Sequence, residues 1–324
     1  MASPIEMDIY DLRTMNREEG VGSPLLQTLP SGLQTAVALG SFDGVHSGHA
    51  ALIRRAVDFA KAHGIASAVW SFRDDASALP GKSGSVLTTL REKLSLIASL
   101  GVDYALLEDF SRVRDYTPGR FVNELLIEGC GTVCAVCGFN FRFGKNGLGD
   151  CDTLRELMSP RECIVVPPVY RNGRLVSSSA IRLLIGAGEM EEAAVLLGRP
   201  FFIDFPVVHG KQLGRTIGIP TINQNFPEGH IIPKSGIYAC TVDIGGDIFL
   251  GVSNVGLRPT VESGPHKINC ETHIINYNGW LYGKSIKVSF YKRLRDEMKF
   301  AGVPELKAQI ERDIASTSAY FADK

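Results

Sequence analysis

The stretch from Thr35 to Ala60 constrains the fold more than any other part of this chain. Thr35 to Leu39 is an apolar run typical of a buried strand, and Gly40 to Gly48 is a loop punctuated by glycine. One helix face then follows at the spacing of Ala50, Ile53, Ala56, Val57 and Ala60. Ile65 to Phe72 reads as the next strand. A strand, a loop, a helix and another strand are typical of a parallel sheet with crossover helices.

The rest of the first half repeats this pattern. Further strands are expected at Val102 to Leu107, Thr132 to Val136 and Cys163 to Val166. Helix starts are indicated by the capping box of Thr89 and Glu92, by Thr117-Pro118, and by Ser177 to Ser179. The first half is therefore expected to be a doubly wound parallel α/β domain.

After Pro200 the pattern changes to strands separated by turns. Strand-like runs span Gly236 to Ile244, Asp247 to Val255, Lys267 to Tyr277 and Ser285 to Phe290. Gly245-Gly246 and Asn278-Gly279 favour primed hairpin turns, which join antiparallel neighbours. We expect a small antiparallel barrel or sandwich closed by one helix from Pro304 to about Ser316. The boundary near Gly198 to Pro200 predicts domains 1–199 and 200–324.

Composition excludes some classes of partner. The 324 residues exceed what one core usually serves, which agrees with two domains. Lysine and arginine number 34 against 35 aspartate and glutamate, so no excess positive charge is present for gripping nucleic acid. Met1 to Gly20 lacks the apolar core of a signal peptide and no membrane-length apolar run follows, so a cytoplasmic location with no membrane partner is expected. Seven scattered cysteines are expected to be reduced.

The loop Gly40-Ser41-Phe42-Asp43-Gly44-Val45-His46-Ser47-Gly48-His49 predicts a phosphate site. Glycines let the backbone approach a ligand, and the helix start offers free amides and a partial positive charge. The imidazoles of His46 and His49 can donate hydrogen bonds to an α-phosphate as negative charge builds. The alternative is that both histidines only cap turns; the strand, loop and helix together favour the phosphate.

Two later segments of the first half carry similar signals. Gly138 to Gly144 combines Asn140 with three phenylalanines, which serve either a ligand or simply a core and a turn. Ser177 to Ser179 place hydroxyls and amides at a helix start, with Arg182 one turn later. That arrangement suits a polyanion, although an ordinary serine cap is the alternative.

These segments together resemble the FMN adenylyltransferase module of the bifunctional prokaryotic riboflavin kinase/FAD synthetase family, a branch of the HxGH nucleotidyltransferases. The resemblance implies that His46 and His49 act in catalysis. It implies that the ATP nucleotide and phosphates are held by Gly40, Phe42, Gly48, Ser178, Ser179 and Arg182. It places Asn140, Phe141 and Arg142 on the flavin.

The segment Gly214-Arg215-Thr216-Ile217-Gly218-Ile219-Pro220-Thr221-Ile222-Asn223 resembles the riboflavin kinase module of that family. In an extended segment Thr221 and Asn223 face one side, where both can meet one magnesium ion and a phosphate. A Pro-Thr turn is the alternative. The resemblance implies nucleotide contacts at Gly214 and Arg215, and it makes Glu271 the general base for the ribityl hydroxyl. It extends through Ser253 to Thr260, Leu281 to Gly283 and Leu294 to Phe300.

The second half departs from the family pattern at three positions. Phe205 stands where glycine is usual, and Ile219 and Ile222 replace the usual phenylalanine and alanine. A bulky Phe205 is expected to crowd the nucleotide or the flavin.

The geometry of two other motifs argues against a P-loop and a zinc site. Gly81-Lys82-Ser83 has no glycine at the P-loop spacing and no strand leading into it. Cys134 and Cys137 lie three apart in a predicted strand, so they face opposite sides and suit structural thiols better than a zinc site.

The sequence is thus interpreted as a bifunctional ATP-dependent transferase. It is expected to phosphorylate riboflavin to FMN and to adenylylate FMN to FAD with release of pyrophosphate. Riboflavin, FMN, FAD and ATP are the expected small-molecule partners, with magnesium or a similar divalent cation as cofactor. Two alternatives remain open: only one step is active, or the protein is a non-catalytic regulator that binds flavin or nucleotide.

Overall fold

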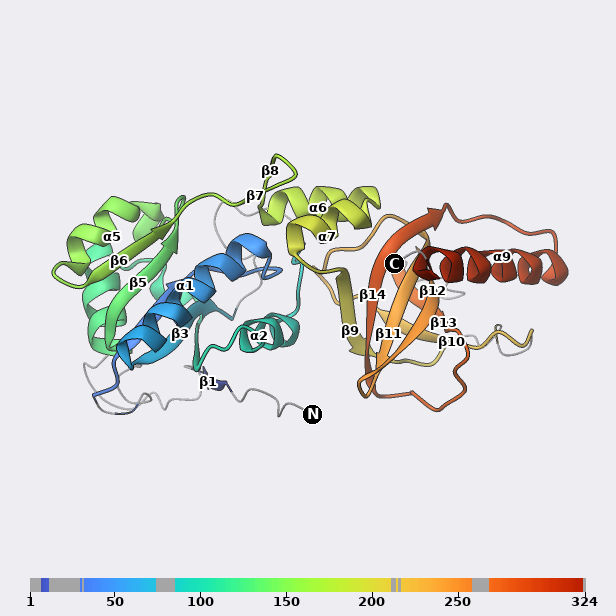
Figure 1. Cartoon of the computed structure of the whole chain (residues 1–324), viewed down its shortest axis with the longest axis horizontal. Helices are drawn as coiled ribbons and strands as arrows, with labels where there is room; N and C mark the ends of the chain where they lie inside the picture. Colours follow the sequence, from blue (N-terminus) through green and yellow to red (C-terminus); the bar gives the residue numbers. More distant parts are fainter. Residues whose placement is uncertain are drawn as a thin grey trace. The chain divides into compact units, whose positions relative to one another are not determined.

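The computed structural model describes residues 7–11, 30, 32–73, 85–210, 214, 217–257 and 268–322. By its internal contacts the chain forms two compact units, Met1–Val176 and Ser177–Lys324, which are described separately below and labelled in Figure 1. The contacts group helices α6 (Ser178–Ala187) and α7 (Met190–Leu197) with the second unit, whereas the sequence analysis placed them before a boundary at 199/200.

The first unit is built on a parallel sheet. Its strands are β1 (Asp8–Asp11), β2 (Thr35–Leu39), β3 (Ala66–Phe72), β4 (Tyr104–Glu108), β5 (Thr132–Gly138) and β6 (Glu162–Val166). Their order is β1-β4-β3-β2-β5-β6, and every neighbouring pair is parallel. The chain winds one way from β2 through β3 to β4 and the other way through β5 to β6. The expected doubly wound sheet is therefore confirmed.

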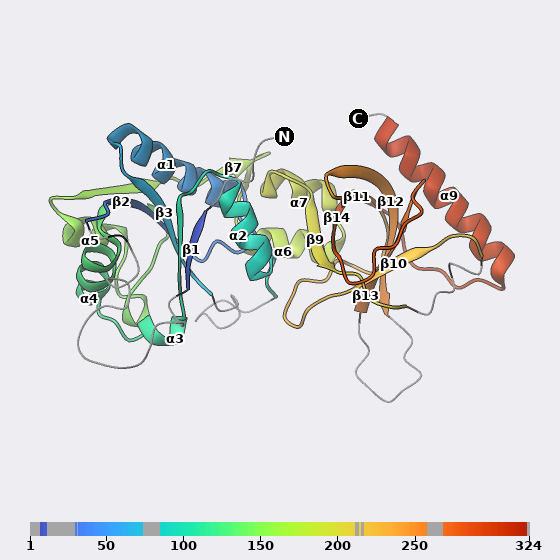
Figure 2. The ribbon, with the colours of Figure 1, turned by 90° about the horizontal axis from the view of Figure 1, so that it is seen from below.

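Helices cover both faces of this sheet. They are α1 (Ser47–His63), α2 (Leu90–Ala98), α3 (Phe110–Val113), α4 (Pro118–Arg120), the π-helix η4 (Phe121–Gly129), the 3₁₀ turn η5 (Lys145–Gly147) and α5 (Cys151–Met158). Alternate residues of β2 divide between two cores. Ala36 and Ala38 pack with α1 and α2, and Val37 and Leu39 pack with η4 and α5. Figure 2 shows α1 and α4 on opposite sides of the strands.

Local capping explains where these helices begin. Thr89 and Glu92 form the expected capping box at α2, and the Thr117 hydroxyl accepts from the Arg120 amide at 3.2 Å beside Pro118. The edge strand β1 was not expected, because it pairs only with β4 and lies in a stretch of mixed charge. A short hairpin, β7 (Tyr170–Arg171) and β8 (Arg174–Leu175), ends this unit.

The second unit is built on an antiparallel sheet. Its strands are β9 (Phe201–Pro206), β10 (Thr221–Asn225), β11 (Gly236–Ile244), β12 (Asp247–Leu257), β13 (Ile268–Ile274) and β14 (Ser285–Arg295), in the order β10-β13-β12-β11-β14-β9. The helix α9 (Val303–Ala322) contacts β11 and β12. Its buried Asp313 accepts from Arg295 of β14 at 2.7 and 2.9 Å. The expected antiparallel domain with a C-terminal helix is confirmed.

The two edge strands of this sheet meet. Strands β9 and β10 contact each other, and Val208 and Asn223 form a bridge next to them. The fully buried Gln224 of β10 donates to the carbonyls of Phe205 and Ile286 at 2.7 Å each. These bonds curl the sheet toward a closed barrel rather than a sandwich.

One of the two predicted hairpin turns is present. Gly245 and Gly246 join β11 to β12 with φ of 66° and 98°, as a type I′ turn requires. The Asn278-Gly279 prediction is wrong, because β13 ends at Ile274 and the left-handed residue there is Asn276, with φ of 58°. Strands β13 and β14 are not sheet neighbours, so their connection is not a hairpin.

Candidate functional site

The first candidate site lies where the winding of the parallel sheet reverses. Strands β2 and β5 are neighbours that lead to opposite halves of the sheet, and ligands of such folds bind outside the carboxyl ends at this point. Gly40 to His49 follows β2, and Gly138 to Gly144 follows β5. The side chain of Leu52 on α1 lies 3.7 Å from the Cβ position of Gly138, so α1 packs beside both loops. The sheet thus brings together two motifs that lie far apart in the sequence.

Hydrogen bonds involving Asp43 and Gly44 hold the loop after β2 against the segment at Leu87 and Thr88. The buried Asp43 carboxylate accepts from the backbone amides of Leu87 and Thr88 at 2.9 and 3.3 Å, and the Gly44 amide donates to the Thr88 hydroxyl at 3.0 Å. Gly44 has φ of 79°, and a Cβ there would lie 2.7 Å from the Leu87 side chain. Asp43 is therefore a brace for the loop, a role that the sequence analysis did not assign.

Phe42 supports the same loop from inside. Its side chain is fully buried and lies against Gly40, where an added Cβ would meet the ring at 3.0 Å. Its φ of 52° is left-handed, which is uncommon for a bulky residue. The buried ring is not accessible to a ligand, so the nucleotide contact predicted for Phe42 stays a prediction about its backbone.

The two histidines form one unit at the start of α1. His46 is the N-cap, and its Nδ1 accepts from the His49 amide at 3.2 Å. The rings stack with centroids 3.6 Å apart. Because Nδ1 of His46 accepts, its neutral ring carries the proton on Nε2. An added Cβ at Gly48 would lie 3.3 Å from the His46 ring and 3.8 Å from the side chain of Val176, which directly precedes Ser177.

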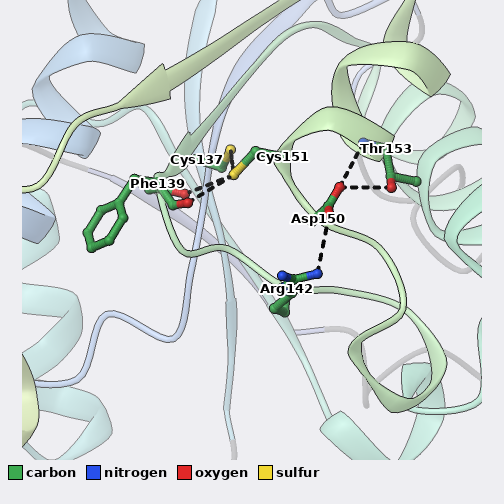
Figure 3. Close-up of polar contacts among 7 residues, drawn as sticks. Cys137, Phe139, Arg142, Asp150, Cys151 and Thr153 are labelled. Carbon is green, nitrogen blue, oxygen red and sulfur yellow. Dashed lines mark hydrogen bonds and ion pairs between the residues drawn. The ribbon is translucent and has the colours of Figure 1, made fainter.

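The loop after β5 divides its aromatic residues between core and surface. Phe143 is buried in the core and Phe141 packs against it, whereas Phe139 is 45% exposed. Figure 3 shows the Phe139 ring pointing away from Arg142, which lies 3.3 Å from Asp150. Asn140 and Arg142 are exposed, so they are open to a ligand. Phe139 was not among the predicted flavin residues, and its exposure only becomes visible in the structure.

Hydrogen bonds and a sulfur contact link this loop to α5. Asp150 caps α5 through the Thr153 amide at 3.0 Å, a bond that, ahead of Arg142, holds the pKa of Asp150 below its usual range. The Cys151 thiol lies 3.3 Å from the Gly138 carbonyl and 3.9 Å from the Cys137 sulfur (Figure 3). These contacts tie the loop after β5 to the start of α5.

Cys134 and Cys137 lie on opposite faces of the sheet, as predicted. Cys134 lies in the core under α1 and Cys137 in the core on the other face of the sheet. Both are free and fully buried, and burial raises the pKa of Cys134 to about 12. Across the described ranges, no three His, Cys, Asp or Glu side chains gather as they would around a metal ion.

The predicted phosphate-binding serines lie at the start of α6. The Ser177 hydroxyl accepts from the Ala180 amide at 3.2 Å, which confirms the cap. Ser178 and Arg182 are half-buried on this helix and Ser179 is exposed. By its contacts α6 belongs to the second unit and is described with it.

The second candidate site lies on one face of the barrel. The register of β10 and β13 places Asn223 directly opposite Glu271, and Thr221 two residues along the same face. Asn223 is 5% exposed, and Glu271 and Thr221 are half-buried. A Cβ at Gly210 would lie 2.5 Å from the Asn223 amide, so glycine is required there.

Gly214 lies beside the same face. A Cβ there would lie 2.2 Å from the Ile219 carbonyl and 3.6 Å from the Thr221 hydroxyl. The predicted Arg215 lies outside the described residues, as do Gly81-Lys82-Ser83 and the Arg258-Pro259-Thr260 segment.

Asn269 belongs to this site, although the sequence analysis did not name it. Its side-chain Nδ2 donates to Asn223 Oδ1 at 3.0 Å and to Glu271 Oε1 at 3.3 Å. Asn269 is only 3% exposed. Its position two residues before Glu271 in a strand was the available signal, because such residues share a face.

An aromatic pocket adjoins Thr221. Its volume is about 290 Å³, and it is lined by Val207, Pro220, Thr221, Ile222, Ile274, Tyr277, Asn278, Gly279, Trp280, Leu281 and Tyr282. Tyr282 stacks on His209 with centroids 4.1 Å apart, and Trp280 is 65% exposed. Such walls suit a flat heterocyclic ring.

Phe205 does not line this pocket. Its ring packs edge-on against His230, with centroids 5.2 Å apart, and against Phe226. Phe205 is 3% exposed and forms part of the core of the barrel. Phe205 therefore lies away from this pocket, whereas Ile222 lines it, and crowding of a nucleotide or flavin by Phe205 stays a prediction.

Comparisons with known proteins cover both units. The FAD synthetase family model matches residues 30–180, and the Riboflavin kinase family model matches residues 197–321. A bifunctional riboflavin kinase/FMN adenylyltransferase of Bacillus subtilis is 36% identical over 296 residues, covering 90% of this chain and 93% of that protein. The protein of the same name from Escherichia coli K12 is 35% identical over 88% of this chain and 92% of its own.

A solved structure shares the whole fold. The crystal structure of a macrolide-efflux protein from Streptococcus pneumoniae matches with a TM-score of 0.81 and 28% identity, covering 90% of this chain and 96% of that chain. Within the described part of this chain, no helix combines the length and apolar character needed to cross a membrane.

Proposed function

The chain belongs to the bifunctional riboflavin kinase/FMN adenylyltransferase family, and we propose that it carries out both reactions. It makes FMN from riboflavin and ATP, and then FAD and pyrophosphate from FMN and a second ATP. The observation that carries this proposal is the pairing of Glu271 with Asn223 on the barrel, in a chain that also keeps both stacked histidines at the switch point of its parallel sheet.

In the adenylyltransferase half, the protein needs to align two anions rather than to remove a proton. The FMN phosphate is already a nucleophile, so the rate depends on its alignment with the α-phosphate of ATP and on charge stabilisation. Nε2 of His46 and the His49 ring supply donors. The backbone at Gly40 and Gly48 lets the phosphates approach. Supporting phosphate contacts are assigned to Ser178, Ser179 and Arg182 as predictions.

The flavin of this half is assigned to the loop after β5. Asn140 and Arg142 supply exposed polar groups, and the exposed Phe139 supplies a ring for stacking. Phe141 packs against the core, so we expect it to support the loop more than to cover the flavin.

In the kinase half, the oxygen atoms of Thr221 and Asn223 fit a magnesium ion. Both are neutral oxygen ligands on one face, and a hard cation that also binds ATP phosphates needs few protein ligands. When bound, the cation shields the charge of the γ-phosphate. Glu271 takes the proton from the terminal ribityl hydroxyl, which is too weak a nucleophile without a base. Gly214 leaves room beside Thr221, and the aromatic pocket takes a flat ring of the nucleotide or the flavin.

Other assignments stay predictions. The functional domains are proposed as 1–199 and 200–324, which keeps α6 with the adenylyltransferase motifs. The small-molecule partners, the absence of a nucleic acid or membrane partner, and the cytoplasmic location are proposed on the same basis as in the sequence analysis.

Chromatographic separation of riboflavin, FMN and FAD tests the function. Purified protein is incubated with ATP and magnesium, starting from riboflavin in one reaction and from FMN in another. We expect FAD in both, with transient FMN in the first. FAD from FMN alone would show that the kinase is inactive, and FMN without FAD would show that the adenylyltransferase is inactive. No product from either would favour the non-catalytic binding protein.

A further inference from the structure

Asn269 occupies a position that links the two key oxygens of the kinase half. Strand alternation puts it on the same face as Glu271, and the β10–β13 register makes it a diagonal neighbour of Asn223. Its amide nitrogen lies 3.0 Å from Asn223 Oδ1 and 3.3 Å from Glu271 Oε1. Both hydrogens of that amide are therefore used on these two oxygens.

Because these hydrogen bonds are buried, they have a strong effect on the orientation of the side chains. Asn269 and Asn223 are 3% and 5% exposed, so an alternative bond to bulk water is largely removed. A buried acceptor that loses its donor carries a desolvation cost, so the Asn269 amide strongly favours one arrangement of its partners. Gly210 packs against the Asn223 amide as well, and this contact restricts its rotation further.

The bonds also select which atoms remain available. An asparagine amide can turn by half a rotation and exchange its oxygen and nitrogen, but only the oxygen can accept from Asn269. The second lone pair of Asn223 Oδ1 is then left for a cation. The bond to Glu271 uses Oε1, which leaves Oε2 for the substrate hydroxyl.

We propose that Asn269 is a positioning residue of the kinase site, holding the Asn223 oxygen toward the cation and the Glu271 carboxylate toward the hydroxyl. This inference rests on the proposed kinase function. Asn269 touches neither substrate nor cation and acts through its two neighbours. A small displacement of such groups lowers the rate of the chemical step by about a hundredfold.

The test compares three variants with the wild-type chain. Asn269→Asp keeps the shape but replaces the donor with an acceptor that faces Glu271. Asn269→Ser keeps one donor for two acceptors. Asn276→Asp is the control for the substitution itself, because it makes the same change at an exposed residue that follows β13.

Three readouts separate positioning from folding. They are kcat and KM for FMN formation, FAD formation from FMN by the same preparation, and equilibrium binding of ADP with Mn²⁺, followed by the electron spin resonance of the metal. For Asn269→Asp we expect kcat for FMN formation to fall about tenfold to a hundredfold with little change in KM for riboflavin. Binding of Mn²⁺ with ADP should weaken, and FAD formation should stay unchanged. Asn269→Ser should be intermediate, and Asn276→Asp should resemble wild type.

Wild-type kcat and Mn²⁺–ADP binding in Asn269→Asp would overturn the inference. So would an equal loss of FMN and FAD formation, because that result indicates a general folding role. A wild-type chain that makes no FMN would contradict the proposed function instead, and the binding measurement would then still decide whether Asn269 orients Asn223.

Discussion

At the residue scale, His46 caps α1 and is also a donor to phosphate in the proposed mechanism. Its Nδ1 accepts from the His49 amide, so the neutral ring carries its proton on Nε2. The cap fixes the orientation of the ring, and the proposal uses that orientation to direct Nε2 at the phosphate. The sequence shows which residues these are, but it cannot show that one histidine orients itself by capping its own helix.

Two variants, His46→Asn and His46→Ala, separate the capping role from the proposed donor role. Asn caps helices well but places no donor at the position of Nε2, so His46→Asn should keep the thermal stability of the wild type. FAD formation from FMN should fall about a hundredfold, because one aligned donor is lost. His46→Ala should lose the same activity and also about 1 kcal/mol of stability through the missing cap.

Calorimetric melting and FAD formation would be measured on both variants. Full FAD formation by His46→Asn would show that His46 is only a cap. Unchanged FMN formation from riboflavin serves as the control for protein quality.

Glu271 is the proposed general base of the kinase half. Glu271→Gln keeps the shape and a bond to its neighbours but cannot accept the hydroxyl proton. We expect FMN formation to fall about a hundredfold or more, while FAD formation from supplied FMN is unchanged. Rates of both reactions, measured on one preparation, check this prediction; a Gln variant with normal FMN formation would exclude Glu271 as the base.

At the element scale, the closure of the barrel depends on one buried side chain. This side chain lies at the seam, the line along which the edge strands β9 and β10 meet. Gln224 reaches from β10 to carbonyls on β9 and β14, which are far from β10 in the strand order. Backbone pairing alone does not join these edges along their length. The side chain therefore ties β10, the strand that carries Thr221 and Asn223, to β9 and β14.

Gln224→Leu should open this seam. It removes both donors from buried carbonyls, which we expect to lower the free energy of unfolding of the second unit by about 1 to 3 kcal/mol. Chemical denaturation followed by the loss of FMN formation would measure this change, with FAD formation from FMN as the reference. An unchanged denaturation midpoint would show that the seam closes without Gln224.

Elements with strong local signals were predictable from the sequence. Periodicity located β2 and α1, and side-chain caps located the starts of α2, α4 and α6. The edge strand β1 and the connection at Asn278-Gly279 were not, because their conformations depend on distant pairing. The same reason applies to Asn269 and Asp43, whose roles come from neighbours across the sheet or in another loop.

At the scale of the whole molecule, the chain combines an adenylyltransferase half and a kinase half, which have different folds. In the proposed mechanism, a parallel sheet with a glycine loop aligns two anions, and an antiparallel barrel supplies a base for an alcohol. The histidine loop lies on the parallel sheet and Glu271 lies on the barrel, and FMN is the product of one reaction and the substrate of the other. The central claim is therefore that one chain carries two separable active sites linked by a free intermediate.

Mixing two variants tests that claim most directly. His49→Ala is expected to make FMN but not FAD, and Glu271→Gln is expected to make FAD only from supplied FMN. Each variant alone, and then an equal mixture, is incubated with riboflavin, ATP and magnesium, and FAD is measured by chromatography. We predict that the mixture makes FAD while neither variant does so alone. A mixture that makes no FAD, from variants that each keep their own remaining activity, would contradict two separable sites that share free FMN.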